Sequence, residues 1–397
     1  MPLCLMDRLV DQCEELGIDG GAVEFEDLGP LLEALNAVPD PRGARGRRYP
    51  WIFLLAGTLL AVLCGAKSLA AVAQWIDDDP AGLLEGLGPG KGRRRMWVST
   101  LSRAFSTMNA DALDDALYGW LNTFVTVADA DAAGPAFIRA YAVDGKAVRG
   151  ACEKGGTAPR LLAALRHEEG IVAAQRQVGT KTTEITAFIP LLDTVDIAGV
   201  AVTADQLHTQ RGHATYLTRR KAYFVFTVGG NHPKLLHALT SLPWDKRRVA
   251  HRTVDRGHGR IEKRTIKVYR APRGLPFPDV TQVFQIERRF TDLDGNALSQ
   301  HVEVGITSLP HTIANPAMIA RLLRGHWNIE ALHCIRDTTY AEDASQVRTG
   351  STPRAMATFR NMAISLLKLT GWNNIAQATR HMTAYPHDAA TLIGLTM

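Results

Sequence analysis

Cysteine is scarce in this sequence, and its few copies lie far apart. The 397 residues contain five, at Cys4, Cys13, Cys64, Cys152 and Cys334, and none belongs to a CxxC pair. An odd number of scattered cysteines argues against a disulfide framework or a zinc ribbon and is typical of proteins in a reducing cytosol. We therefore expect a cytoplasmic protein.

A hydrophobic run long enough to cross a bilayer is also absent. The longest uncharged apolar stretch, residues 51–66, is shorter than the roughly 20 residues that a transmembrane helix needs. The first thirty residues are acidic and do not follow the basic-then-apolar pattern of a signal peptide. We expect residues 51–66 to form a buried helix, and we expect no association with membranes.

Basic residues are nearly missing from the first 40 positions, which hold ten acidic residues and only Arg8. The rest of the chain therefore carries 44 basic and 30 acidic residues, although the net charge of the whole is only +5. Such an excess suits a polyanion partner, and nucleic acid is the commonest one. Ordinary solubility charge explains the excess equally well at this level.

The first part of the chain, residues 1–130, is predicted to be mostly helical. Helices between residues 50 and 124 resemble a helix-turn-helix in outline, although an ordinary helical bundle fits the pattern at least as well. Basic clusters at residues 42–48 and 91–95 flank these helices. They favour DNA binding by this N-terminal domain.

From about residue 136 the pattern changes to short strands that alternate with helices. Three strands, a helix, a strand, a helix and a strand are predicted at 137–145, 160–167, 171–179, 183–195, 199–206, 212–221 and 222–228. This order is that of a ribonuclease-H-like sheet. A strand-rich insertion follows at about 245–308, and then one long helix from Pro316 to Asp337.

The predicted fold class is therefore α/β, with a ribonuclease-H-like catalytic core at residues 136–375 that contains the insertion. An all-helical N-terminal domain precedes the core, and residues 376–397 are expected to be a C-terminal tail. No internal repeat is visible.

Two aspartates stand where strands of this core are predicted to end. Asp144 lies in "AVDGK" and Asp205 in "VTADQ". A rigid sheet positions carboxylates at strand ends while leaving them open to substrate. An aspartate before glycine is also ordinary turn chemistry, so neither residue alone would indicate a site. Both together, on adjacent central strands, favour one.

A stripe of polar residues marks the long helix. His326, Glu330, His333 and Asp337 are spaced by four, three and four residues, so they share one helix face. A solvent-facing stripe would have the same spacing, but Trp327 and Ile329 beside it favour a partly buried surface. Carboxylate oxygens suit Mg²⁺ or Mn²⁺, and two such ions clamp the attacking and leaving oxygens of a phosphodiester. The histidines lack zinc-site spacing.

Several long motifs resemble the DDE transposases of bacterial insertion sequences, specifically the H-repeat-associated (ISAs-type) family. They cover nearly the whole chain and occur in the family's order: "VPDPRGARGRRYP", "AVDGKAVRGA", "TTEITAFIPLL", "VTADQLHTQ", "DRGHGRIEKR" and "RGHWNIEALHCIRDTTYAEDASQVRTG". The resemblance implies that Asp144, Asp205 and Glu330 are the catalytic, metal-binding residues, with Asp337 and Glu342 as the nearest rivals of Glu330.

The resemblance further implies cleavage and strand transfer of DNA with two Mg²⁺ or Mn²⁺ ions. The expected partners are terminal inverted repeats and target DNA, bound by a dimer or a higher oligomer associated with the nucleoid. Candidate DNA contacts are Lys146, Arg149, Arg260, Arg324 and His326, although almost any exposed cation could serve.

Two positions depart from the family's pattern. Glycine stands at Gly229 where a lysine is expected, and His232 stands where a glutamine is expected. Two alternatives therefore stay open beside an active transposase: a DNA-binding protein that has lost its chemistry, and a nuclease with the same ribonuclease-H-like core.

Overall fold

The computed structural model describes residues 31–88, 95–132, 138–152, 156–179, 182–257 and 259–395. The acidic residues 1–30 and most of the predicted basic cluster at 91–95 lie outside these ranges. None of the helices within them is long and apolar enough to cross a membrane.

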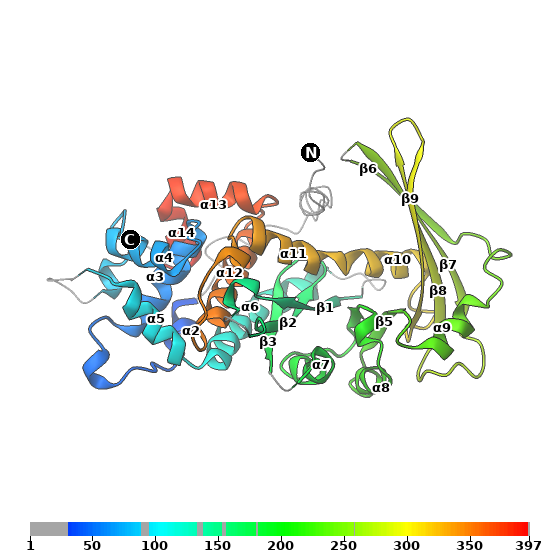
Figure 1. Cartoon of the computed structure of the whole chain (residues 1–397), viewed down its shortest axis with the longest axis horizontal. Coiled ribbons are helices and arrows are strands. Elements are labelled where there is room, and N and C mark those ends of the chain that lie inside the picture. The colour runs from blue at the N-terminus through cyan, green and yellow to red at the C-terminus, as the bar shows by residue number, and fades with distance from the viewer. Residues whose placement is uncertain are drawn as a thin grey trace.

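Within the described residues, a single sheet of nine strands runs from the middle of the molecule to one end, in the order β3-β2-β1-β4-β5-β9-β8-β7-β6 (Figure 1). Its strands are β1 (Ala140–Ala147), β2 (Arg160–Arg166), β3 (Val172–Val178), β4 (Ala201–Ala204), β5 (Tyr223–Val228), β6 (His251–Gly257), β7 (Arg260–Arg270), β8 (Gln282–Asp292) and β9 (Ala297–Thr307).

The first five strands confirm the predicted ribonuclease-H-like core. β1, β2 and β3 form an antiparallel meander, whereas β1 pairs parallel with β4, and β4 with β5. The crossover from β3 to β4 contains α7 (Glu184–Leu192), and the one from β4 to β5 contains α8 (Arg211–Arg219). β4 is buried along its whole length, as its continuous apolar run predicts.

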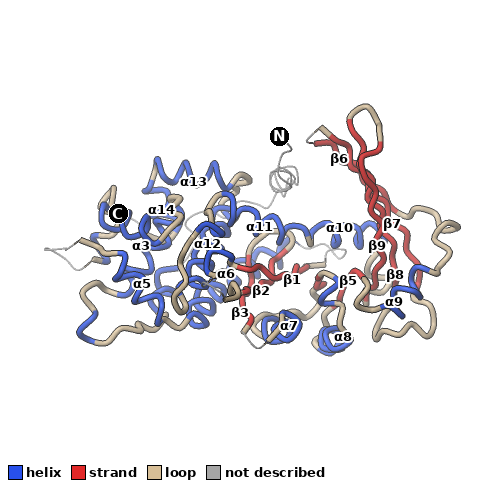
Figure 2. Tube along the Cα trace, in the orientation of Figure 1, coloured by secondary structure: helices blue, strands red, loops and turns tan. Residues whose placement is uncertain are grey.

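The insertion is strand-rich as predicted, and it continues the same sheet. β9 pairs antiparallel with β5, and β8, β7 and β6 follow as an antiparallel meander. The ends of these strands project beyond the helices that cover the core (Figures 1 and 2). We call β6–β9 the ribbon.

Helices cover both faces of the sheet. On one face, α7, α8 and α9 (Pro233–Thr240) pack on residues such as Val143 and Val202. The opposite face is covered by α10 (Pro316–Gly325), α11 (Trp327–Thr338) and α12 (Thr352–Leu369). Side chains alternate along a strand, so Ala142, next to Val143, faces α11 and α12.

The N-terminal and C-terminal helices share one hydrophobic core, which we call the helical lobe (Figure 1). Its helices are α2 (Leu31–Asn36), α3 (Trp51–Leu63), α4 (Leu69–Asp78), α5 (Val98–Thr107), α6 (Ala110–Ala132), α12, α13 (Ile375–Ala384) and α14 (Pro386–Leu392). Residues 376–397, expected to be a tail, are thus helical over most of their described length.

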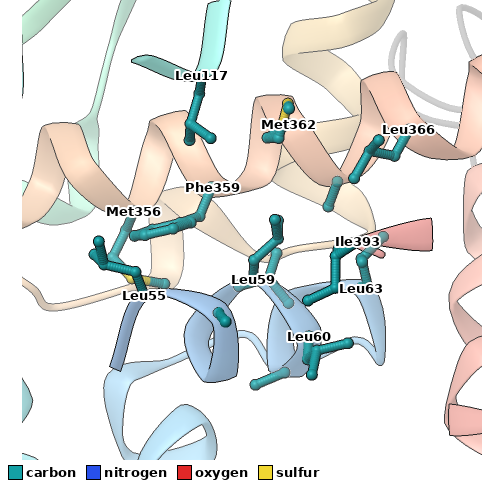
Figure 3. Close-up of a cluster of buried hydrophobic side chains, with 14 of the residues drawn as sticks. Leu55, Leu59, Leu60, Leu63, Leu117, Met356, Phe359, Met362, Leu366 and Ile393 are labelled. Atoms are coloured by element: carbon teal, nitrogen blue, oxygen red, sulfur yellow. The ribbon is translucent and has the colours of Figure 1, made fainter. Parts of the chain in front are cut away.

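Helix α3 lies at the centre of the lobe, as the apolar run predicts. All but one of its residues are buried, and it packs on α12 from the far end of the chain (Figure 3). Residues 79–97, rather than a tight turn, separate α4 from α5. The described helices therefore fit the predicted bundle better than a helix-turn-helix.

Candidate active site

The two predicted aspartates lie side by side where the parallel pairing of β1 and β4 ends. Asp205 follows the end of β4 as predicted, but Asp144 lies inside β1, because β1 continues to Ala147 in its pairing with β2. The register of β1 and β4 pairs Val143 with Ala204, so the next position sets Asp144 beside Asp205. Neighbouring strands are about 4.8 Å apart. Residues two positions apart on a strand face the same side of the sheet, so Asp144 lies on the side of Ala142, and Asp205 on that of Thr203. This is the face covered by α11.

Helix α11 brings the third predicted residue over this edge of the sheet. The predicted long helix is divided at His326 into α10 and α11, and Glu330 lies in the first turn of α11. A Cβ at Gly325, just before the division, would overlap the ring of His167, which follows β2. Glycine therefore permits the close approach of α10 to the sheet.

The acidic residues act on one another electrostatically. Burial is the largest cause that raises the pKa of Asp144, to about 7, against a hydrogen bond donated by the Gly145 N–H. The negative charges of Asp205, Glu330 and Glu184 raise it further. Burial also raises the pKa of Glu330, Arg288 opposes that change, and Asp205 adds to it. Burial and the negative charges of this group together therefore outweigh the effect of Arg288.

This donor set fits a hard divalent cation, because closely placed carboxylates with raised pKa values gain from a counter-ion and offer oxygen ligands. In the described ranges, however, no three His, Cys, Asp or Glu side chains are close enough to enclose an ion. The charges of Asp144, Asp205 and Glu330 influence one another, but the three carboxylates do not meet around a common point.

Backbone N–H groups fix the orientation of the Asp205 carboxylate. It ends β4 and caps the short helix η5 (Gln206–His208), accepting hydrogen bonds from the N–H groups of Leu207 at 2.9 Å and His208 at 3.3 Å. The strand end therefore presents an oriented oxygen donor.

Thr203, two residues earlier on β4, connects two histidines behind the site. Its Oγ1 lies 3.1 Å from Nδ1 of His326 and 3.0 Å from Nε2 of His167. Burial lowers the pKa of both rings, to about 4 for His326. These neutral histidines anchor the junction of α10 and α11 to the sheet.

The rivals of Glu330 are engaged elsewhere. Asp337 accepts a hydrogen bond from Nζ of Lys146 at 2.5 Å. Glu342 is fully buried between Arg336 and Arg360, with N–O distances of 2.7 and 2.9 Å. Burial alone would raise the pKa of Glu342, but the two guanidinium groups hold it at about 2. Glu330 is thus the carboxylate of this segment that acts on both aspartates.

Two of the five predicted DNA contacts point into the protein. Lys146 is buried against Asp337, and His326 bonds to Thr203. Arg149 is 81% exposed. On the ribbon side, Arg260 lies over the ring of Phe290, and Arg324 forms an ion pair with Asp255 at 3.1 Å.

The departures at Gly229 and His232 lie close to the second aspartate. A Cβ at Gly229 would overlap the side chain of Gln206, the residue after Asp205. A lysine at position 229 would therefore require Gln206 to move. His232 packs edge-on against Phe277, and its Nε2 is buried without a hydrogen-bond partner.

Sequence reasoning did not assign a role to three nearby residues. Nδ1 of His333 lies 3.6 Å from Oδ2 of Asp144, and its position one turn after Glu330 was the available signal. Glu184 and Arg288, which act on Asp144 and Glu330, come from α7 and β8. Their sequence distance from the site left no signal.

Comparison with known proteins gives consistent results along the chain. Residues 135–366 match a family described as "Transposase DDE domain", and residues 32–121 match one described as "DDE_Tnp_1-associated". YncI of Escherichia coli O157:H7, named as a transposase, is 25% identical over 85% of this chain and 87% of its own length. H repeat-associated YhhI of Escherichia coli K12, also named as a transposase, is 23% identical over 86% and 91%.

A shorter relative and one solved structure also match this chain. A protein from the dhlA 3′ region of Xanthobacter autotrophicus is 31% identical over 63% of this chain and 82% of its own length. Among solved structures, a piggyBac transposase synaptic complex with hairpin DNA aligns with 98% of this chain and 82% of its own, at 11% identity and a TM-score of 0.42.

Proposed function

Because this chain belongs to the DDE transposase family, in its H-repeat-associated branch, we propose that it cleaves and joins DNA strands at the ends of an insertion sequence. Asp144, Asp205 and Glu330 are its catalytic residues and hold two Mg²⁺ or Mn²⁺ ions. The observation that carries the proposal is the parallel register of β1 and β4, which pairs the two aspartates beneath the helix of Glu330.

The chemistry divides between the ions and the chain. When bound, the ions supply Lewis acidity to the phosphodiester and lower the pKa of water. Asp205 presents an oxygen donor that two backbone N–H groups orient. His333 lies beside Asp144, and Lys146 pairs with Asp337, so that this acid does not compete for the ions.

DNA is the proposed partner, as terminal inverted repeats and as target. Arg149 and Arg260 remain candidates, and Arg324 becomes one if its ion pair opens. The ribbon adds Arg252, Arg256 and Lys263, which the strand register sets on the face turned away from α10. Joining two ends requires at least a dimer on the DNA. The proposed location is the cytoplasm, at the nucleoid.

Incubation of the purified chain with DNA that carries its own terminal inverted repeats tests this function. With Mg²⁺ or Mn²⁺ we expect nicks at the repeat ends and joining of the free 3′ ends to a second DNA. Asp205→Asn should bind the same DNA and leave it uncut. Equal products from the wild type and Asp205→Asn would refute catalysis by this site.

The contact between Gly229 and Gln206 favours a second candidate, a DNA-binding protein without chemistry. In that case the chain would bind the repeats and never cut them, whereas metal-dependent nicking that requires Glu330 excludes this role. A nuclease with the same core would hydrolyse DNA without joining strands. The same incubation, analysed for joined products, therefore separates all three functions.

A further inference from the structure

A chain of ion pairs connects the ribbon to both sides of the division at His326. Arg324, at the end of α10, contacts Asp255 of β6 at 3.1 Å, and Asp255 contacts Arg264 of β7 at 2.6 Å. Arg264 also contacts Glu262 at 2.6 Å, and Oε1 of Glu262 accepts a hydrogen bond from Nε of Arg288 at 3.0 Å. The series thus ends on β8.

Arg288 carries this series to α11. Its guanidinium carbon lies 4.1 Å from the centroid of the Trp327 ring, a close stacking contact. Trp327 is the first residue of α11, and Glu330 follows three residues later, on the same side of the helix. The contact therefore holds the turn that bears Glu330.

The interior of the series is well shielded from water. Glu262 is 2% exposed, and the side chains of Arg264 and Arg288 are 13% and 16% exposed. Charge-assisted hydrogen bonds are strong in such surroundings, and the two oxygens of Glu262 bind different arginines. Glu262 therefore fixes the orientation of the Arg288 guanidinium.

We propose that Arg288 is a positioning residue, which fixes the first turn of α11 through Trp327 and so sets Glu330 relative to Asp144 and Asp205. The inference rests on the proposed function, because it takes Glu330 as a metal ligand. It gives the ribbon a task separate from DNA contact: it orients the third carboxylate. The positive charge of Arg288 also opposes the rise in the pKa of Glu330.

Titration of the whole chain with Mn²⁺, without DNA and followed by calorimetry, tests the proposal. Arg288→Lys keeps the charge and loses the planar stack, and we expect it to weaken Mn²⁺ binding by roughly tenfold, as losses around metal ligands commonly do. Arg288→Met should weaken it as well. The matched control is Arg289→Lys, which changes an exposed arginine of the same strand on the opposite face and should leave Mn²⁺ affinity unchanged.

A role through charge alone gives the opposite result. Removing a cation near the ions would then tighten Mn²⁺ binding in Arg288→Met and leave Arg288→Lys like the wild type, and this result overturns the proposal. Equal losses in Arg288→Lys and Arg289→Lys overturn it too. Should Arg288→Lys fail to fold, Trp327→Leu removes the stacked ring at a partly exposed position without changing any charge, and it carries the same expectation.

Glu330→Gln separates this inference from the proposed function. If Glu330→Gln binds Mn²⁺ as the wild type does, the proposed metal site itself fails. If Glu330→Gln weakens Mn²⁺ binding and Arg288→Lys does not, only the positioning role of Arg288 fails. Strand cleavage by Arg288→Lys should recover at high Mn²⁺, because excess metal compensates for weak binding.

Discussion

The helical lobe and the ribbon flank the same core, but different forces attach them to it. The lobe contributes a continuous apolar core in which α3 and α12 are almost fully buried. The inner ribbon is also apolar where it packs on α10, but Asp255 forms an ion pair with Arg324 of α10, and Arg288 lies over the ring of Trp327 of α11. Apolar burial resists salt, whereas partly exposed ion pairs do not. The site therefore lies between the lobe, whose contacts are apolar, and the ribbon, whose contacts include salt-sensitive ion pairs.

The largest effect is expected in the lobe, from Phe359→Ala. Phe359 of α12 is fully buried and faces α3 (Figure 3). Its ring centroid lies 5.8 Å from that of Phe105. Loss of the ring leaves a cavity and should lower the free energy of unfolding by about 3–5 kcal/mol, measured by urea denaturation. Val254→Ala, at an exposed position of the ribbon, is the control and should change it by less than about 0.5 kcal/mol. Similar losses of stability in the two variants would contradict the difference between the lobe and the ribbon.

A buried ionic cluster joins α12 of the lobe to α11, and Glu342→Gln tests how much it matters. The change leaves Arg336 and Arg360 buried without a counter-charge, so we expect a loss of about 3 kcal/mol at pH 7. The folded-state pKa of Glu342, about 2, is below its ordinary value, so its stabilisation is present above about pH 4.5 and is lost as the pH falls towards 2. Melting temperatures of the variant and the wild type should converge in that range. A constant difference would assign the loss to packing.

At the site between the two flanks, Asp144→Asn should stabilise the metal-free protein. The folded-state pKa of Asp144, about 7, is above its ordinary value, so ionisation costs stability as the pH rises from about 4 to 7. A rise of about three pKa units corresponds to roughly 4 kcal/mol, and partial exposure of Asp144 reduces it, so at pH 8 the amide should add roughly 3 kcal/mol to the free energy of unfolding. At pH 4 it should add nothing. Thermal unfolding at both pH values measures this. A variant less stable than the wild type at pH 8 would contradict it.

The smallest effect is expected at the ribbon, from Arg324→Gln. The ion pair of Arg324 with Asp255 is partly exposed, so its loss should cost at most about 1 kcal/mol at low salt. The cost should shrink further near 1 M salt, where charges are screened beyond about 3 Å. The loss in Phe359→Ala should stay unchanged in the same titration. A salt-independent loss in Arg324→Gln would show that packing, not charge, dominates this contact between the ribbon and α10.

Local patterns predicted most of the core. The hairpin of β2 and β3 has a glycine turn between apolar runs, and the continuous apolar run of β4 indicated a strand buried on both faces. Signals for the C-terminal helices were also present, since Asn374 caps α13 and Pro386 begins α14. Gly325 likewise preceded the division of the long helix. These features could have been recognised from the sequence.

Contacts between distant segments could not be predicted in this way. The pairing of β9 with β5 depends on the folded core, and so does the burial of Lys146 against Asp337, 191 residues away. Adjacent parallel strands placed Asp144 beside Asp205 on sequence grounds. The position of Arg288 near Glu330 could not be predicted, because it depends on the path of the ribbon, the break at His326 and the contact of Arg288 with Trp327.

The shared core of the helical lobe has a consequence for synthesis at the ribosome. Helix α3 ends at Leu63, and the α12 residues that cover it begin at Thr352. At about 5–20 residues per second, a segment apolar on all sides waits some tens of seconds for its partner. A chain interrupted before α12 would leave that segment exposed and prone to aggregation or proteolysis. Shortened copies of such a gene would therefore be removed rather than accumulate as inhibitors that compete for the same DNA.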